Sequence, residues 1–212
     1  MLFKHVFLWV AICFALMLAI PIVSSPQAMW ENARTELGMI ETAFGTGDTV
    51  ALAKSATQTY NTIFIDTGLI QKTRGAYVSR EEQELGEAMV GGASRAVTGL
   101  TNNYLDTFAA LTYVMILRVM IFMSWLPFIL PFLLAAVGEG VTRRKIKYAT
   151  FGQYGAALYA GAMHMSVLIL ILPVLYLMAP LPLTPFFIPL WALIAAIPVI
   201  ASIANASQIL PR

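Results

Sequence analysis

Residues 118–147 read RVMIFMSWLPFILPFLLAAVGEGVTRRKIK. This stretch begins with one arginine, continues through residues 119–138 without a charged side chain, and ends in a cluster of basic residues. An uncharged apolar run of about 20 residues can cross the hydrocarbon core of a bilayer as a helix. Short loops that are rich in Lys and Arg stay on the cytoplasmic side of such a helix. The stretch therefore predicts a transmembrane helix whose C-terminal end lies in the cytoplasm.

Three further apolar runs, at residues 6–23, 159–179 and 186–206, also lack charged side chains. Hydrophobic residues make up 59% of the chain and charged residues 11%, against about 45–50% and 25% in soluble domains. Four membrane crossings keep every basic cluster on one side, whereas three or five would place the 143–147 cluster and the C-terminal tail on opposite sides. We therefore predict an all-α membrane protein with four transmembrane helices and both termini in the cytoplasm.

The first apolar run, residues 6–23, has the features of either a signal sequence or a first membrane helix. As a helix it would extend over roughly 27 Å, and it is longer than the usual core of about 7–15 residues in a signal peptide. We therefore predict an uncleaved anchor. Cleavage stays open as an alternative, because the small residues Ser24 and Ser25 follow the run.

The region between the first two runs, residues 24–106, is the one stretch with ordinary polarity. It carries ten acidic and six basic side chains, whereas the remainder of the chain carries seven basic side chains and one acidic. This separation of charge predicts that residues 24–106 form a domain on the far side of the membrane from the 143–147 cluster.

Helical patterns dominate this outer domain. An apolar stripe that begins at Trp30 predicts a helix whose polar face includes Glu36, and a second helical stretch follows from about Thr49. Ser79 and Glu82 form a capping box that opens a third helix, although the pair Gly91-Gly92 could break it. The stripe consists of Trp30, Ala33, Leu37, Ile40 and Phe44, opposite Glu31, Arg34, Glu36 and Glu41.

Arg118 makes the start of the second membrane span ambiguous. A span from residue 107 would bury the arginine in the bilayer at a cost of about 2.5–3.5 kcal/mol, whereas a span from residue 119 would let it reach the interface. We favour the second reading, in which residues 107–138 form one long helix that descends from the outer domain. Pro127 and Pro131 predict a kink within it.

The sequence contains no enzyme motif and no ligand set for a metal or cofactor. It has no phosphate-binding glycine loop and no His-Glu-x-x-His run, and Cys13 is the one cysteine. We therefore predict a protein that is not an enzyme and that binds no cofactor.

Seven polar residues near the membrane are candidates for contact with a partner protein or with lipid. Arg118 and His164 could mark an ion path, but a structural role is the commoner reason for such residues. Glu139 and Arg143 have the spacing of a helix-surface ion pair. The basic cluster at 143–147 mainly indicates membrane topology. It could also bind anionic lipid or an acidic partner. It is too narrow for a nucleic-acid interface. The candidates are Arg118, Glu139, Arg143, Arg144, Lys145, Lys147 and His164.

Small residues spaced four apart, such as Ala156/Ala160 and Ala192/Ala196, predict close helix packing within the chain or in a homo-oligomer. The predicted segments are an N-terminal transmembrane helix (1–23), a helical periplasmic domain (24–106), a long helix with the second span (107–138), a basic cytoplasmic loop (139–158), a transmembrane hairpin (159–206) and a cytoplasmic tail (207–212).

Several short motifs in the second half of the chain follow one another in a fixed order. They are Leu126-Pro127-Phe128-Ile129-Leu130-Pro131, Glu139-Gly140, Arg143-Arg144, Phe151-Gly152 and Tyr159. This order resembles a family of small multipass inner-membrane proteins from bacterial conjugative plasmids and integrating conjugative elements. The likeness covers roughly residues 108–206. It implies a location in the inner membrane and a place in a conjugative apparatus, with a gene beside the coupling ATPase that feeds DNA to a type IV secretion channel.

The leading hypothesis is a non-enzymatic inner-membrane component of conjugative transfer that anchors or assists the coupling protein. The expected partners are membrane lipid, the coupling ATPase or other type IV secretion components, and further copies of the chain. Two other hypotheses stay open. One is a transporter or channel subunit, which a broken span at Pro127 and Pro131 would suit. The other is an exclusion or surface-recognition protein that uses residues 24–106.

Overall fold

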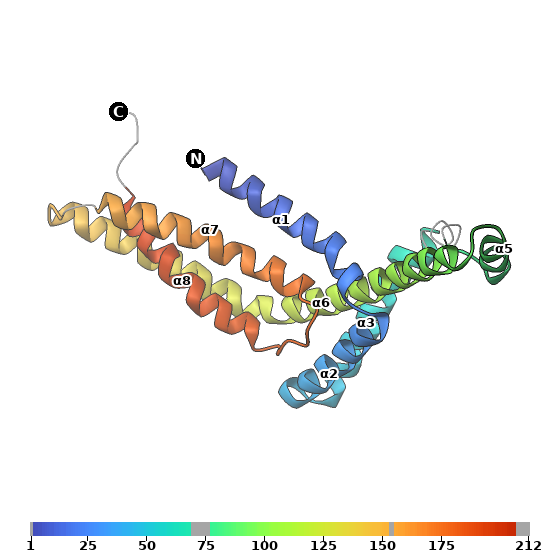
Figure 1. The fold of residues 1–212 in the computed structure, drawn as a ribbon. Coiled ribbons are helices and arrows are strands. Elements are labelled where there is room, and N and C mark those ends of the chain that lie inside the picture. The colour runs from blue at the N-terminus through green and yellow to red at the C-terminus, as the bar shows by residue number, and fades with distance from the viewer. Residues whose placement is uncertain (1, 69–76, 153–154, 207–212) are drawn as a thin grey trace. The chain divides into compact units, whose positions relative to one another are not determined.

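The computed structural model describes residues 2–68, 77–152 and 155–206, and the elements within these ranges are helical (Figure 1). This confirms the predicted all-α class. In chain order the elements are α1 (Leu2–Val23), α2 (Pro26–Phe44), α3 (Thr46–Asn61), the π-helical segment η1 (Thr62–Asp66), α5 (Arg80–Val90), α6 (Gly92–Ala149), α7 (Ala156–Met178) and α8 (Phe187–Asn205).

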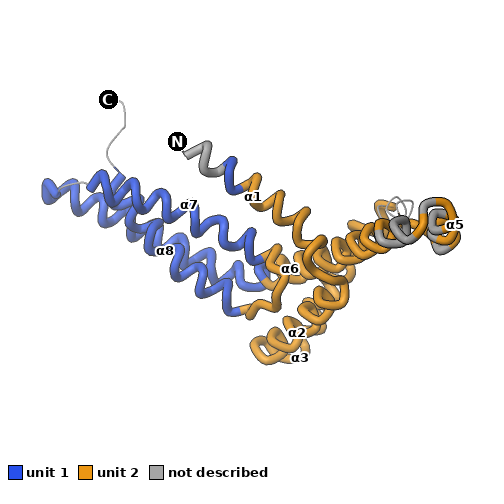
Figure 2. The backbone as a smooth tube through the Cα atoms, viewed as in Figure 1, with its two compact units in different colours: residues 1–9, 122–176, 186–212 blue, residues 10–121, 177–185 orange. Residues whose placement is uncertain are grey.

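The chain divides into two compact units (Figure 2). Unit 1 contains the second part of α6, from Phe122, together with most of α7 and all of α8. Unit 2 contains residues 10–121 and residues 177–185. The second range begins with the last two residues of α7, and we call it the connection between α7 and α8. The connection thus belongs with α2, α3 and the first part of α6, although it is distant from them in the sequence.

Local sequence signals explain the boundaries of the short helices in unit 2. Ser25 caps α2 by accepting a hydrogen bond from the backbone N–H of Ala28, and Pro26 occupies the first turn, where a missing N–H costs nothing. Gly45 ends α2 at a φ of 89°, which a residue with a Cβ would adopt only with strain. The next helix, α3, then begins at Thr46, three residues before the predicted start.

The predicted capping box at the start of α5 is present. Glu82 accepts hydrogen bonds from the backbone N–H and the hydroxyl of Ser79, and the Ser79 hydroxyl accepts one from the N–H of Glu82. The helix then ends at Val90, because Gly91 adopts a φ of 78° before α6 begins. Of the two predicted alternatives, the break at Gly91 is therefore the one that occurs.

Arg118 lies in α6, which contains 58 residues and continues through Pro127 and Pro131. This helix is longer at both ends than residues 107–138. Because α6 ends at Ala149, the residues from 139 onward that were predicted as a loop are helical, and the connection to α7 is confined to residues 150–155.

The interior of unit 2 includes an apolar cluster between α1, α2, α6 and the end of α7, made by Ile20, Met29, Ala110, Leu111 and Met178. The buried side of α2 consists of Met29, Ala33, Glu36 and Ile40. The predicted stripe was therefore correct for Ala33 and Ile40 but wrong for Trp30, which is 42% exposed. The buried line is rotated towards Met29, and it includes a glutamate that the sequence placed on the polar face.

Unit 1 is built by close packing of α6 with α8 and of α7 with α8. Gly140 lies against α8, where an added Cβ would come within 2.9 Å of the Ile203 Cβ. On α8, the Trp191 indole donates a hydrogen bond of 2.7 Å to the carbonyl of Ile169 on α7. These contacts give the helices of unit 1 a defined register along one another.

Among the described residues, three helical segments are long and apolar enough to cross a membrane. They are Val97–Ala149 within α6, α7, and α8. The pair Phe7–Val23 and Pro26–Phe44 would provide a fourth span if its two helices, bent by 109° at the break, were counted as one. The chain thus has three or four candidate spans.

Candidate functional site

Arg118 on α6 forms a buried ion pair with Glu36 on α2. Both residues have no exposed surface. The Arg118 Nε donates to Glu36 Oε1 at 3.1 Å and to Oε2 at 3.2 Å, and the Nη2 group also donates to Oε1. A guanidinium matches a carboxylate well in this paired geometry, because its N–H groups form a rigid planar fork.

The remaining donors of Arg118 bind the backbone of the connection between α7 and α8. The Nη1 group donates to the carbonyls of Leu177 and Ala179 at 3.1 and 2.8 Å, and Nη2 donates to the carbonyl of Leu181 at 2.7 Å. Glu36 Oε1 in turn accepts the backbone N–H of Leu183 at 3.0 Å. We call these six residues the Arg118 network.

The Arg118 network explains how an irregular segment is held against α2 and α6 in unit 2. The connection contains Pro180, Pro182 and Pro185, which cannot donate backbone hydrogen bonds, so its carbonyls lack the partners that a helix would supply. Arg118 supplies those donors, and Asn32 adds one to the carbonyl of Pro180 at 3.0 Å. The network therefore positions the connection, and Glu36 compensates the buried positive charge.

Two sequence predictions are corrected by this geometry. Arg118 was expected to extend to the membrane interface, but its side chain is fully buried within unit 2. Glu36 was expected on the polar face of its helix, but it is also fully buried. The signal for the pair was present in the sequence, because Glu36 has helical spacing with Met29, Ala33 and Ile40.

The other candidate residues on α6 lie in its last three turns, within unit 1. Arg143 Nε donates to Glu139 Oε1 at 2.7 Å, and the two side chains are 60% and 47% exposed. This is the expected ion pair between residues four apart. Lys147 is half-buried, and its Nζ donates to Oδ1 of Asn205 on α8 at 2.6 Å. Arg144 is half-buried and Lys145 is exposed.

A hollow of about 400 Å³ separates the end of α6 from α8 in unit 1. Two cations from α6 and a mainly apolar surface from α8 form its lining. The lining residues are Arg143, Lys147, Ile197, Ile200, Ala201, Ala204 and Asn205. The structure thus brings Arg143 and Lys147 to one site, whereas Arg144 and Lys145 do not line it. The contribution of α8 to the hollow could not be predicted from the sequence, because that contribution depends on how the helices pack.

The end of α6 is closed by backbone hydrogen bonds. The N–H of Gly152 donates to the carbonyl of Lys147 at 2.8 Å, and the N–H of Phe151 donates to that of Tyr148 at 3.3 Å. This is the Schellman arrangement, in which the residue in the left-handed conformation is usually glycine. Here it is Phe151, with a φ of 51° and a side chain that is 97% exposed.

His164 is not among the residues that line the hollow between α6 and α8. It lies on α7 in unit 1, and its side chain is exposed on the surface of the chain.

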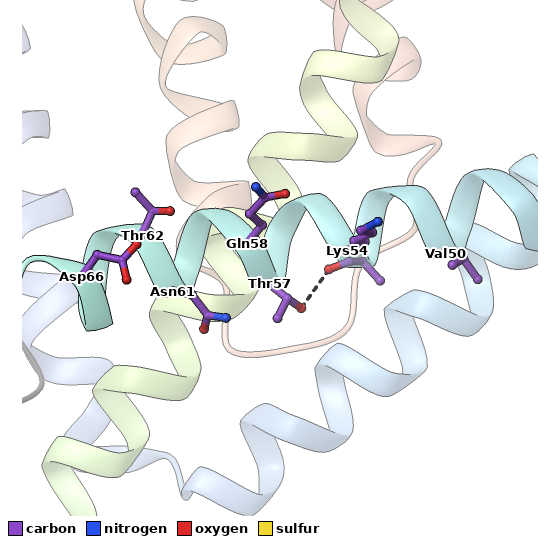
Figure 3. A pocket seen from close by; sticks show the side chains of 8 residues that line it. Val50, Lys54, Thr57, Gln58, Asn61, Thr62 and Asp66 are labelled. Carbon is purple, nitrogen blue, oxygen red and sulfur yellow. Dashed lines mark hydrogen bonds between the residues drawn. The ribbon is translucent and has the colours of Figure 1, made fainter.

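A third feature is an open groove of about 890 Å³ along one face of α3 and η1 (Figure 3). Its lining is polar apart from Val50 and Ala53, and it includes Lys54 and Asp66. The remaining residues are Thr57, Gln58, Asn61 and Thr62, whose spacing of three and four places them on one side of a helix. No motif in the sequence predicted this face as a site.

The fold defines an all-helical protein with three or four helices suited to cross a membrane. Comparison with protein families adds a specific relationship. The family model described as "IncC plasmid conjugative DNA transfer protein DtrJ-like" matches residues 32–210, and the chain therefore belongs to the DtrJ-like family. No curated protein and no solved structure matches the chain. The expected kinship with conjugative plasmid proteins is confirmed, and the match includes most of residues 24–106, where the sequence motifs gave no likeness.

Proposed function

We propose that this protein is a non-enzymatic inner-membrane component of conjugative DNA transfer, and that it anchors or assists the coupling ATPase of the type IV secretion apparatus. The observation that carries the proposal is membership of a conjugative transfer family over residues 32–210, in a chain with several long apolar helices. The expected contribution is structural, since the described side chains offer surfaces for contact and a buried ion pair.

The proposed topology has four crossings, by α1, α6, α7 and α8, with both termini in the cytoplasm. Residues 24–106 then lie in the periplasm and the basic end of α6 lies in the cytoplasm. The distribution of charge supports this orientation, because four basic side chains at 143–147 face a single nearby carboxylate, Glu139. Residues 139–158 and the tail 207–212 would be the cytoplasmic parts of the chain.

The surface proposed for the coupling ATPase is the side of the basic end that carries Arg144 and Lys145. Lys145 is exposed, and neither residue lines the hollow between α6 and α8. Exposed cations of this kind attract an acidic partner surface and accelerate its association, and salt weakens the attraction. An acidic patch on the partner is therefore the complement that this surface requires.

Deletion of the gene followed by complementation in trans tests the proposal. We expect deletion to lower the frequency of DNA transfer and the tagged protein to co-purify with the coupling ATPase from detergent-solubilised membranes. The double variant Arg144→Gln/Lys145→Gln should lose that co-purification. The matched control is Arg34→Gln/Lys54→Gln, which removes two exposed cations from α2 and α3 and should retain it. Normal transfer in the deletion strain would refute the proposal.

A transporter or channel subunit is the main alternative. Its support in the sequence was a span broken at Pro127 and Pro131, with the polar residues Arg118 and His164. However, α6 continues through both prolines, and the donors of Arg118 bind Glu36 and backbone carbonyls inside the chain. That arrangement favours a structural role for Arg118. The exclusion or surface-recognition hypothesis for residues 24–106 stays a prediction, which exchange of that region between related proteins would test.

A further inference from the structure

The hollow between α6 and α8 combines two cations with an apolar wall. Arg143 and Lys147 are one helical turn apart on α6, and α8 contributes Ile197, Ile200 and Ala201. The volume of about 400 Å³ is within the range of roughly 300–1,000 Å³ that small-molecule sites occupy. A ligand that fits this lining has an anionic group at one end and a hydrocarbon part at the other.

Arg143 and Lys147 each have more N–H groups than their described hydrogen bonds use. Lys147 donates one described hydrogen bond, to Asn205, and Arg143 donates one, to Glu139. An ammonium group has three N–H donors and a guanidinium has five. Part of the local positive charge interacts favourably with the partial negative charge at the C-terminal ends of α6 and α8. This end of α6 nevertheless carries a net positive charge that can bind a phosphate. It has four cations, at positions 143, 144, 145 and 147, and one nearby carboxylate, Glu139.

The position of the hollow along the helices indicates where such a ligand would come from. Lys147 is in the last turn of α6 and Asn205 is the last residue of α8, so the hollow lies at the ends of two candidate membrane spans. If both helices cross the bilayer, as the proposed function requires, these ends lie among the lipid headgroups. Ile197, which is 70% exposed, then faces the acyl region.

The neighbouring surface also suits the membrane interface. Ile146, Tyr148 and Phe151 are exposed by 55%, 64% and 97%. Phe151 holds a left-handed backbone conformation that favours glycine, and its side chain is almost wholly outside the chain. Apolar and aromatic side chains beside Lys and Arg are typical of surfaces that insert into the headgroup region.

We propose that this hollow is a binding site for an anionic phospholipid. Arg143 and Lys147 bind the headgroup phosphate, and Ile197, Ile200 and Ala201 contact the glycerol and the start of an acyl chain. Arg144 and Lys145 are outside the site, so lipid binding and attachment of a protein partner use different sides of the same helix end.

The test is a titration of the purified full chain in detergent with fluorescent phosphatidylglycerol, with phosphatidylcholine as the neutral comparison. The double variant Arg143→Gln/Lys147→Gln should bind phosphatidylglycerol about tenfold more weakly or worse, because two phosphate-binding cations are gone. The double variant Arg144→Gln/Lys145→Gln removes the same charge and should keep its affinity within about twofold. Equal losses in the two double variants would overturn the proposal, since they would indicate attraction by net charge alone.

A third variant and two competitors make the test more specific. Ala201→Phe fills the hollow without removing a charge, and it should also abolish the preference for phosphatidylglycerol; normal binding by this variant would place the lipid elsewhere and refute the site. Circular dichroism and gel filtration confirm that each variant is folded.

Competitors separate the lipid from other anionic ligands. Displacement of the lipid by inorganic phosphate at equal concentration would overturn the proposal in favour of a free phosphate site. Displacement by polyglutamate would overturn it in favour of an acidic protein segment. Loss of co-purification with the coupling ATPase is a separate readout, so the two proposals can fail independently.

Discussion

Arg118 and Glu36 lie 82 positions apart in the sequence and form a fully buried ion pair. The pair joins α6 to α2, and the other donors of Arg118 bind the connection between α7 and α8. Three segments that are distant in the chain are thereby fixed to one guanidinium. The stability of unit 2 should depend strongly on this arginine.

Replacement of Arg118 should therefore destabilise the protein severely. Arg118→Met keeps an unbranched apolar side chain but removes the guanidinium, and it leaves a buried carboxylate without its partner, which costs about 3–5 kcal/mol. The matched control is Arg143→Met, which breaks the exposed pair with Glu139 and should cost at most about 1 kcal/mol. Thermal unfolding in detergent, followed by circular dichroism, measures both. Similar melting temperatures for the two variants would contradict the role assigned to Arg118.

Removal of both charges should be less harmful than the sum of the single losses. Arg118→Met/Glu36→Met takes away the uncompensated carboxylate together with its partner, although the carbonyls of Leu177, Ala179 and Leu181 still lose their donors. We expect the double variant to be about as stable as Arg118→Met or more stable. The same unfolding measurement applies, and additive losses would show that the two side chains do not act as a pair.

The contact between α6 and α8 at Gly140 can be tested with a single methyl group. Gly140→Ala places a Cβ 2.9 Å from the Cβ of Ile203, so the helices must separate and we expect destabilisation of roughly 1–3 kcal/mol. Gly138→Ala, two residues earlier on the same helix, meets nothing within 4 Å and should be neutral or stabilising by up to about 1 kcal/mol. Equal behaviour of the two variants in thermal unfolding would argue against this packing.

Tyr77 should ionise at unusually high pH. Burial, followed by the hydrogen bond to Asp106, raises the pKa of Tyr77 to about 12 from the ordinary value of 10. Because the folded-state pKa is the higher one, the contribution of Tyr77 to stability is complete below pH 10 and is lost as the pH rises through about 12. The difference in tyrosinate absorbance between the parent protein and Tyr77→Phe measures this titration. Asp106→Asn should lower the pKa only in part, since burial remains, and a Tyr77 titration centred at pH 10 would refute the assignment.

Local signals were sufficient to predict most of the helices. The absence of charge marked α1, α7 and α8 within a few residues, and Ser79 marked the start of α5. These predictions succeed because caps and apolar runs act over a few neighbouring residues. The extension of α6 to Ala149 was missed because basic residues were interpreted as a loop, although Lys and Arg are good helix formers and favour a helix C-terminus.

The Arg118 network could not be predicted in the same way. Its partners are separated by long stretches of sequence, and four of them take part through backbone atoms, which leave no trace in the residue types. Glu36 was the one accessible signal. Its spacing with Met29, Ala33 and Ile40 put a carboxylate on a buried line, and an arginine within an apolar helix needs such a partner.

Photo-crosslinking in mating cells tests the proposed contact between the basic end of α6 and the coupling ATPase in the cytoplasm. A photoreactive amino acid is placed at position 145, and at position 50 on α3 as the control, where Val50 is 62% exposed. After illumination, mass spectrometry identifies the captured proteins. We expect capture of the coupling ATPase from position 145 and not from position 50. Capture from position 50 alone, or of other proteins but no coupling ATPase from position 145, would contradict it.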